Sequence, residues 1–480
     1  MFMANDLISL MKPKIDFIID EKFYPAVLWN HSFLNAVHNS KKSVPLYIAL
    51  QRGDDSVSTF ESRVFSQKSK YNSLNYFYLE RLVKTLLWIY GGPKIIIGGP
   101  KEIGEHIKKL YSQKGKRFFD ANFMSNIYEK PFSVVDGSAE QMASIKEKSI
   151  PLNRQLKGCR IGFDLGASDR KVSAVIDGNV VFSEEVVWNP SVQTNPDYHY
   201  HEIMSMLHRA AARMPRVDAI GGSSAGIYIN NRVMSASIFR GVPPDLFEKR
   251  VKRIFLDIQK KWDVPFKVIN DGEVTALAGS MSLKVNAVLG IAMGSSEAGG
   301  YVDRKGNITT QLNELAFVPI DFNEQAPVDE WSGDRGCGVQ YFSQVAVIRL
   351  AKKAGIVFDE KQTPAEKLKF VQMLMSKGDD RAKKVFETIG CYLGYGIAYY
   401  ADFYDIKHIL ILGRVTSGEG GQIILQKAEQ ALKEKFPELF KNISLHLPDE
   451  SIRRVGQSIA AASLPTLQQI DDIKKKWRVK

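Results

Sequence analysis

The sequence has few of the residues and segments that mark secreted, disulfide-linked or membrane-spanning proteins. Its 480 residues include only three cysteines, Cys159, Cys337 and Cys391, which lie far apart. An odd number of isolated cysteines fits neither a disulfide framework nor a metal-ligand spacing, so we expect a reducing, cytoplasmic environment. The first residues lack the sustained apolar core of a secretory signal. The most apolar later window, residues 82–90, contains Lys84 and is too short to cross a bilayer.

Low-complexity tracts are also absent, and the composition is that of an ordinary globular protein. A chain of this length is longer than a single hydrophobic core usually accommodates, which predicts about two to four domains or lobes. The net charge is +12, but lysines and arginines are spread among acidic residues along the chain. A solvated surface explains this pattern, with a mild attraction for an anionic substrate. We therefore expect neither nucleic acid nor a membrane as a partner.

Residues 160–188 have the pattern of three consecutive strands. Their alternation puts Gly162, Asp164 and Gly166 on one face and apolar residues on the other. Asp177 followed by Gly178 predicts a hairpin between the second and third strands. An aspartate between glycines leaves room for a ligand against bare backbone, and the small residues after it can offer N–H groups to a phosphate. Taken alone, the stretch also fits an ordinary meander whose aspartate faces solvent.

Later apolar strands end in small or polar residues, where open α/β sheets bind ligands. Residues 264–269 lead into Asn270 and Asp271, and residues 286–293 lead into a Gly-Ser-Ser-Glu-Ala-Gly-Gly turn. Residues 407–412 lead into a third such loop, which begins at Gly413. One glycine-rich turn is a weak indication of phosphate binding. Two such turns are a stronger indication. The turn that begins at Gly166 and the turn that begins at Gly294 lie about 130 residues apart, and each follows an apolar strand.

Residues 1–150 have a mixed α/β pattern with the same order of elements that follows residue 160: strand, strand, helix, strand, helix. Residues 47–56, YIALQRGDDS, align with residues 160–169, RIGFDLGASD, which puts Gln51 in the place of Asp164. The segment is either a degenerate internal duplicate or an unrelated extension or interaction element, for example one that forms a homodimer. Without a carboxylate at position 51, a duplicate would not hold a metal ion as Asp164 could.

Taken in order, these motifs resemble the actin-like ATPase superfamily, and most closely its ROK family of sugar kinases. The resemblance covers about residues 158–465 and includes Leu-Gly-Arg-Val at residues 412–415. It implies an α/β fold with two ribonuclease-H-like lobes around a nucleotide cleft. Residues 157–283 with 451–465 would form the first lobe and residues 284–450 the second. Residues 1–150 would be an N-terminal α/β extension that packs on or beside the first lobe.

The resemblance also implies roles for individual residues. Asp164 would coordinate Mg²⁺, Asp271 would be the catalytic base, and Asn270 and Glu314 would bind the sugar. The residues that would hold ATP lie in two phosphate loops and an adenosine loop: Gly166, Ala167 and Ser168; Gly294, Ser295 and Ser296; and Gly413, Arg414 and Gly418.

The chemistry of phosphoryl transfer suits the Asn-Asp pair. This reaction depends on positioning and charge neutralisation more than on covalent help. A carboxylate at a strand end can accept the proton of the acceptor hydroxyl, and a neighbouring amide can hold that hydroxyl in line. The alternative is that Asn270 and Asp271 only cap the helix that follows them.

The chain departs from the family pattern in its sugar half. Phe317 stands where the family has the histidine of its Glu-x-x-His motif, and Val339 stands where the family has a glutamate. The family's zinc-binding cysteine cluster is reduced to Cys337, so we expect no zinc. The motifs that would bind ATP match the family pattern better than those that would bind the sugar, so the identity of the acceptor stays open.

The leading hypothesis is thus a sugar kinase, a phosphotransferase with an alcohol group as acceptor, that uses ATP and Mg²⁺. A sensor of sugar or nucleotide on the same fold is a second reading, and an ATPase that couples to a partner through residues 1–150 is a third. Residues 1–150 show no helix-turn-helix rhythm, which argues against a DNA-binding regulator.

Overall fold

A computed structural model describes residues 19–53, 56–138, 149–150, 154–309, 311–448 and 450–466. The chain divides into two compact units. The first unit comprises Met1–Ser149, Ile291–Gly299 and Thr310–Leu447, and the second comprises Ile150–Gly290, Gly300–Thr309 and Pro448–Lys480. Among the helices of the described ranges, none has the length and apolar character needed to span a bilayer.

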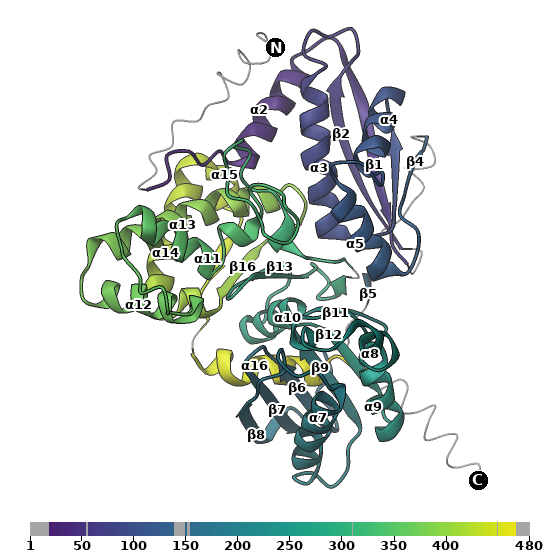
Figure 1. Ribbon diagram of the computed structural model, residues 1–480, viewed down its shortest axis with the longest axis vertical. Coiled ribbons are helices and arrows are strands. Elements are labelled where there is room, and N and C mark those ends of the chain that lie inside the picture. Colours follow the sequence, from purple (N-terminus) through teal and green to yellow (C-terminus); the bar gives the residue numbers. More distant parts are fainter. Residues whose placement is uncertain are drawn as a thin grey trace. The chain divides into compact units, whose positions relative to one another are not determined.

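The second unit is built on a five-stranded mixed sheet (Figure 1). Its strands are β6 (Cys159–Leu165), β7 (Asp169–Ile176), β8 (Asn179–Val187), β9 (Ala219–Ser224) and β12 (Phe266–Asn270). They lie in the order β12-β9-β6-β7-β8, in which β6, β9 and β12 are parallel while β7 is antiparallel to both of its neighbours. The predicted hairpin is present, with Asp177 and Gly178 both at positive φ between β7 and β8. Because parallel strands end at one edge, the carboxyl ends of β6, β9 and β12 lie together.

The other elements of the second unit surround this sheet. They are α7 (Pro196–Ala211), β10 (Ile227–Ile229), β11 (Arg232–Ser235), α8 (Pro244–Lys249), α9 (Ile254–Trp262), α10 (Asp271–Leu283) and α16 (Glu450–Ala462). Buried side chains of β6, β9 and β12 form one core with those of α7 and α9, including Phe163, Leu207 and Phe255. The core fixes the sheet beneath the edge at which Asp164 and Asp271 lie.

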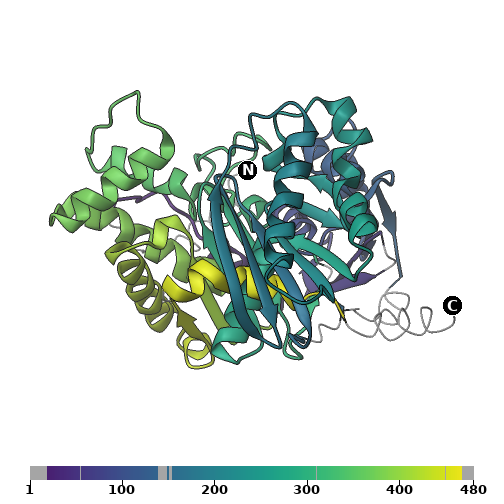
Figure 2. The same cartoon turned by 90° about the horizontal axis from the view of Figure 1, so that it is seen from below.

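Helix α16 rests directly on the sheet, as the yellow helix across the strands in Figure 2 shows. Two glycines permit this approach, because a Cβ atom at Gly162 would overlap the carbonyl oxygen of Ser458, and one at Gly221 would overlap that of Ala461. The interpretation of Gly162 as bare backbone beside a ligand is therefore wrong. Its missing side chain makes room for a helix.

A six-stranded sheet has the order β17-β16-β13-β14-β15-β5. Its strands are β5 (Ser149–Ile150), β13 (Val288–Met293), β14 (Glu297–Val302), β15 (Ile308–Thr309), β16 (His408–Leu412) and β17 (Ser444–His446). The helices of the first unit that follow in sequence are α11 (Gln344–Lys353), α12 (Pro364–Ser376), α13 (Asp380–Tyr400), α14 (Glu419–Lys435) and α15 (Pro437–Phe440).

The N-terminal part of the first unit has a sheet of its own. Its elements are α2 (Ala26–His38), β1 (Ser43–Gln51), β2 (Val57–Phe65), α3 (Leu74–Tyr90), β3 (Lys94–Gly98), α4 (Lys101–Leu110), α5 (Phe118–Tyr128) and β4 (Ser133–Asp136). The strand order is β2-β1-β3-β4, and β3 runs antiparallel to β1. In the second unit, by contrast, β9 runs parallel to β6. The similar order of elements therefore does not produce the same topology, which argues against an internal duplicate.

Residues 1–149 share their compact unit with the segments at 291–299 and 310–447. Buried polar contacts explain this. Asp20 is 4% exposed, and it binds Arg349 at 3.0 Å, Lys353 at 2.6 Å and the hydroxyl of Tyr392 at 2.5 Å. The backbone N–H of Tyr24 donates to Asp321 Oδ1 at 3.0 Å. Such contacts join residues distant in sequence, so the sequence pattern does not reveal them.

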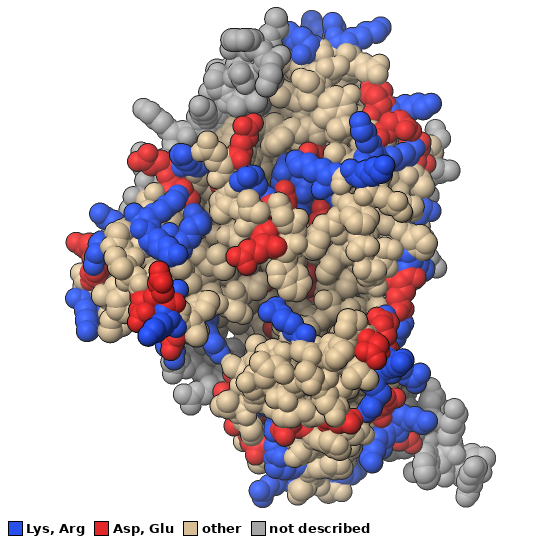
Figure 3. Space-filling model, in the orientation of Figure 1, with Lys and Arg blue, Asp and Glu red and all other residues tan. Residues whose placement is uncertain are grey.

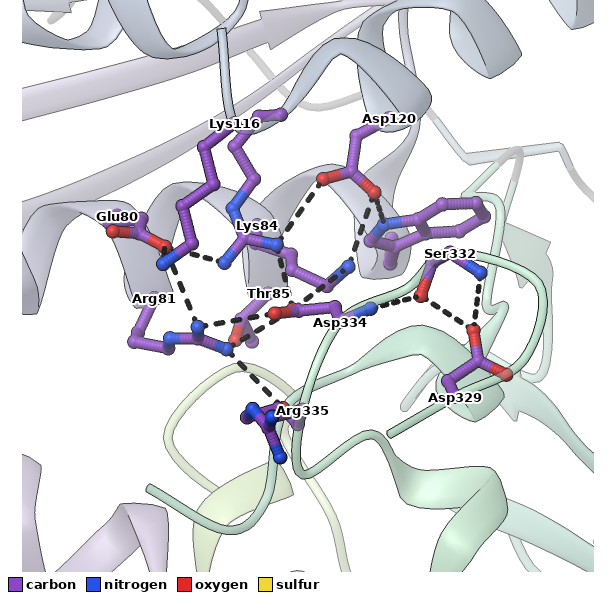
Figure 4. Close-up of polar contacts among 12 residues, drawn as sticks. Glu80, Arg81, Lys84, Thr85, Lys116, Asp120, Asp329, Ser332, Asp334 and Arg335 are labelled. Atoms are coloured by element: carbon purple, nitrogen blue, oxygen red, sulfur yellow. Dashed lines mark hydrogen bonds and ion pairs between the residues drawn. The ribbon is translucent and has the colours of Figure 1, made fainter. Parts of the chain in front are cut away.

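A second set of buried contacts joins α3 and α5 to the loop at residues 329–335 (Figure 4). Lys84 Nζ lies 3.2 Å from Asp120 Oδ1 and 3.2 Å from Asp334 Oδ2, and Arg81 and Arg117 also pair with Asp334. Although burial alone would raise the pKa of Asp334, these three cations hold it well below its usual value. On the face drawn in Figure 3, basic side chains lie interspersed with acidic ones.

Candidate functional site

Asp164 lies on β6 near its carboxyl end and is 6% exposed. Ser223, its partner in register on the parallel strand β9, donates a hydrogen bond from Oγ to Asp164 Oδ1 at 2.6 Å. Lys171, opposite Asp164 on β7, pairs with Asp169 at 3.4 Å. Burial raises the pKa of Asp164. A desolvated carboxyl of this kind gains most from a cation, and oxygen is the ligand that Mg²⁺ prefers.

The turn at Gly166, Ala167 and Ser168 connects β6 to β7 and is fixed by hydrogen bonds. Gly166 N–H donates to Asp169 O at 2.9 Å, which closes the turn. Trp188, directly after β8, donates its backbone N–H to Ser168 O at 3.1 Å and its Nε1–H to Gly166 O at 2.9 Å. The position of this loop is therefore set before any ligand binds.

Asn270 is the N-cap of α10, as the alternative interpretation of the pair predicted for a helix start. Its Oδ1 accepts from Gly272 N–H at 2.7 Å, and its Nδ2–H donates to Gly226 O at 2.7 Å. A side-chain amide has two donors and two acceptor sites, so one of each remains for another ligand. Capping thus orients Asn270 without using up its hydrogen-bonding capacity.

Asp271 is the first residue of α10 and is partly exposed. Burial and then the negative charge of Asp164 raise the pKa of Asp271 to about 6. A carboxylate whose pKa approaches neutrality is a better proton acceptor than an ordinary aspartate, because general bases work best when their pKa lies near the operating pH. The second unit therefore brings Asp164, Asn270 and Asp271 to one sheet edge.

Gly294, Ser295 and Ser296 form the tight turn between β13 and β14. Gly294 N–H donates to Ser296 O at 2.9 Å, and both serines are exposed. A Cβ atom on Gly413, which has φ 103°, would overlap the carbonyl oxygen of Met293. The start of the predicted adenosine loop therefore touches the residue before the second phosphate loop.

Arg414 and Gly418 continue the predicted adenosine loop, and both are exposed. Gly418 has φ 66° and is the N-cap of α14. Two predicted nucleotide-binding loops thus lie together in the first unit, whereas Asp164 and Asp271 belong to the second.

Glu314, which we predicted to bind the sugar, is partly exposed and donates its backbone N–H to Trp88 O at 3.0 Å. Phe317 stacks on Trp88 with ring centroids 4.1 Å apart, so an aromatic contact fills the place of the family's histidine. Cys337 is buried, and burial raises the pKa of its thiol to about 12. Within the described ranges, no group of three or more potential metal ligands is present. Val339 is partly exposed.

Sequence reasoning missed two residues beside these loops. Ser223 becomes identifiable only once β9 is known to pair with β6 in the register that puts it opposite Asp164. Glu297 follows the second phosphate loop and is 3% exposed, and its Oε1 accepts from the hydroxyl of Tyr400 at 3.2 Å. Burial, with a smaller contribution from Glu314, raises the pKa of Glu297 to about 8, so this carboxyl is mostly protonated at neutral pH. A lone carboxylate inside a small-residue turn was its only signal.

Known proteins resemble this chain in sequence family and in fold. Residues 160–446 match the ROK family. A ROK family glucokinase from Streptomyces griseus, solved with glucose and AMPPNP, is 17% identical with a TM-score of 0.50, and the match covers 64% of this chain and 99% of that one. The ROK hexokinase of Thermus thermophilus is 17% identical with a TM-score of 0.51, over 65% and 99% of the two chains.

A ROK family transcriptional regulator, a homologue of the E. coli MLC protein, is 18% identical with a TM-score of 0.52, over 75% of this chain and 95% of that one. A search of curated proteins finds no significant match. At these identities the solved structures establish the fold of the part that they cover, which is the predicted α/β fold with two ribonuclease-H-like lobes of the actin-like ATPase type. The described part of residues 1–138 has the mixed α/β structure predicted for an N-terminal extension. The family match spans more than half of the chain, and the protein therefore belongs to the ROK family.

Proposed function

We propose that the protein transfers the γ-phosphoryl group of ATP to a hydroxyl group of a hexose or a related small carbohydrate. The observation that carries this proposal is a pair of carboxylates, one near the carboxyl end of β6 and one directly after β12. Asp164 and Asp271 lie close enough that the charge of one raises the pKa of the other. A protein that only binds a sugar or nucleotide has no need for a second carboxylate of raised basicity.

In the proposed reaction, Asp271 is the base. As the hydroxyl oxygen bonds to the γ-phosphorus and the bond to ADP breaks, the hydroxyl proton passes to the Asp271 carboxylate. Asn270 holds the hydroxyl with the donor and the acceptor that capping leaves available. Glu314 accepts hydrogen bonds from other hydroxyls of the same sugar.

The predicted loops would hold the nucleotide. The turn at Gly166, Ala167 and Ser168 and the turn at Gly294, Ser295 and Ser296 would face the phosphates, while Gly413, Arg414 and Gly418 would face the adenosine. Asp164 fits a Mg²⁺ ion because it is a buried carboxyl that accepts a hydrogen bond from the neutral hydroxyl of Ser223. The ion would neutralise charge on the phosphates.

ADP release by the full-length chain tests the proposal. The assay uses Mg-ATP with a panel of hexoses, N-acetylated hexoses and their derivatives, and a control without sugar. Sugar-dependent release with formation of a sugar phosphate is the expected result. Release that is independent of sugar would identify an ATPase instead.

A second candidate function is that of a regulator, since a ROK transcriptional regulator shares this fold over 75% of the chain. Binding of sugar or nucleotide without any ADP release would identify a sensor. The described part of residues 1–138 forms a four-stranded sheet with helices α2 to α5. Measuring binding to DNA fragments, with and without sugar, would test for a DNA-binding regulator.

A further inference from the structure

The C-terminal end of α3 is capped by the segment that carries Glu314. The last four carbonyl groups of a helix have no partner inside it and must be satisfied from outside. In α3, Trp88 O accepts from Glu314 N–H at 3.0 Å, and Ile89 O accepts from Asn313 N–H at 2.9 Å. The other two carbonyl oxygens, of Leu87 and Tyr90, accept from Gly91 N–H and Arg52 Nη1–H. Half of this helix end therefore depends on residues 313 and 314.

The Trp88 side chain holds the other end of the same segment. Its ring is fully buried and stacks on Phe317, with centroids 4.1 Å apart and planes 23° apart. Phe123 from α5 lies 5.0 Å from the Trp88 ring. One residue of α3 thus contacts residues 313–317 at both ends, with its carbonyl at Glu314 and its ring at Phe317.

Trp88 is itself fixed by contacts with Asp120, which pairs with Lys84; both of these residues are labelled in Figure 4. Its Nε1–H donates to Asp120 Oδ1 at 2.8 Å, and the same carboxylate oxygen lies 3.2 Å from Lys84 Nζ, one helical turn earlier. Lys84 also lies 3.2 Å from Asp334. A buried ion pair of this kind is costly to break, which restricts the Trp88 ring to one position.

The segment needs such support, because Asn313 has φ 54°. Asparagine adopts this left-handed conformation more readily than other residues with a side chain, and surrounding contacts hold Asn313 in it. They include the hydrogen bond to Ile89 O at 2.9 Å and one from the hydroxyl of Tyr404 to Asn313 Oδ1 at 2.9 Å. The conformation at position 313 sets the direction in which Glu314 follows.

We propose that Trp88 is a positioning residue for the acceptor site: through its carbonyl and its ring it orients residues 313–317, and thereby Glu314, toward the carbohydrate. This inference rests on the proposed function, in which Glu314 contacts the sugar. It makes the N-terminal α/β segment a part of the acceptor site, in place of a separate accessory element. The family's histidine position, occupied here by Phe317, has become the attachment point for α3.

Two substitutions at position 88 separate the ring from its polar group. Trp88→Phe keeps an aromatic ring over Phe317 and removes the Nε1 donor, whereas Trp88→Leu removes the stack. Phe33→Leu is the matched control, since Phe33 is equally buried in the N-terminal segment and its ring contacts Trp29, Phe65 and Tyr78 of the same segment. Thermal unfolding and ATP affinity are measured for all variants, so that a variant that fails to fold is recognised.

The expected result is a rise in acceptor KM of about 2- to 10-fold for Trp88→Leu, the range that loss of an aromatic pair supports. The KM for ATP should be unchanged, Trp88→Phe should restore most of the acceptor KM, and Phe33→Leu should leave it as in the wild type. A merely structural role would lower stability in Trp88→Leu and Phe33→Leu alike without this difference in KM.

Hydrogen exchange of the peptide covering residues 311–318 gives a readout that does not depend on activity. We expect faster exchange at Asn313 and Glu314 in Trp88→Leu than in Phe33→Leu. Equal exchange in the two variants, or an unchanged acceptor KM in an active Trp88→Leu enzyme, would overturn the positioning role. Absence of sugar-dependent ADP release in the wild type would instead overturn the proposed function, and with it the link between this segment and an acceptor.

Discussion

Replacing Asp271 by asparagine should lower the sugar-dependent turnover and raise the stability of the fold. The substitution conserves the size of the side chain. In the wild type, Gly272 N–H donates to Asp271 Oδ1 at 3.0 Å, and the Oδ1 of an asparagine can accept the same hydrogen bond. Because Asn270 is the cap of α10, the helix start remains intact. An amide cannot accept the proton of the acceptor hydroxyl, so sugar-dependent turnover should fall by about 10²- to 10⁴-fold, the usual contribution of a general base. ATP affinity should change little.

The stability change follows from the raised pKa of Asp271. A rise from 3.8 to about 6 is roughly two pKa units, each worth about 1.4 kcal/mol. Because the side chain is partly exposed, solvent screening reduces the upper limit of about 3 kcal/mol to about 1–2 kcal/mol. The folded state binds the proton more tightly than the unfolded state, so the carboxylate costs stability progressively as the pH rises from about 4 to 6, and fully above that.

Thermal unfolding without nucleotide or metal therefore gives a second test. At pH 8 Asp271→Asn should unfold at a higher temperature than the wild type, and near pH 3.5 the difference should vanish because both side chains are neutral. Asp257→Asn is the control, since Asp257 lies exposed in the first turn of α9 in the same unit. Turnover within about twofold of the wild type would refute the role as base. A lower unfolding temperature at pH 8 would refute the electrostatic reasoning.

Four further substitutions or measurements test other parts of the molecule. Asp164→Asn should weaken nucleotide binding in the presence of Mg²⁺ and leave metal-free binding nearly unchanged, as titration calorimetry can measure. Gly221→Ala should destabilise the chain by about 1–3 kcal/mol or more in urea unfolding, since the added methyl group overlaps the backbone of α16; unchanged stability would contradict that packing. Lys84→Met should cost about 3–5 kcal/mol, because it leaves the buried Asp334 with less compensating charge; a stable variant would show that hydrophobic packing replaces the pair. Elemental analysis should find no stoichiometric zinc, because the Cys337 thiol is buried and its raised pKa keeps it protonated.

Much of the second unit could be predicted from local sequence. The alternation at residues 160–188 predicted three strands, and the Asp177-Gly178 turn set their hairpin, because a two-residue turn with positive φ at both positions requires residues of this kind. The same local logic placed Asp164 near one strand end and Asp271 directly after another. These features depend on neighbours in the chain, and the order of the motifs was enough to indicate the family.

Only the tertiary structure decided what lies against each of these elements. Gly162 and Asp164 share a strand face, yet α16 covers the first and the second lies at the sheet edge, since a helix more than 280 residues later packs on that face. The raised pKa of Glu297 likewise comes from burial, which outweighs the opposite effect of the hydrogen bond from Tyr400. The place of residues 19–138 was decided by long-range contacts, among them those of Trp88, whose partners Glu314 and Phe317 lie more than 220 residues away. Periodicity and turn chemistry report on spacings of a few residues, whereas hydrogen bonds that cap a helix from a distant segment form only when the chain has folded.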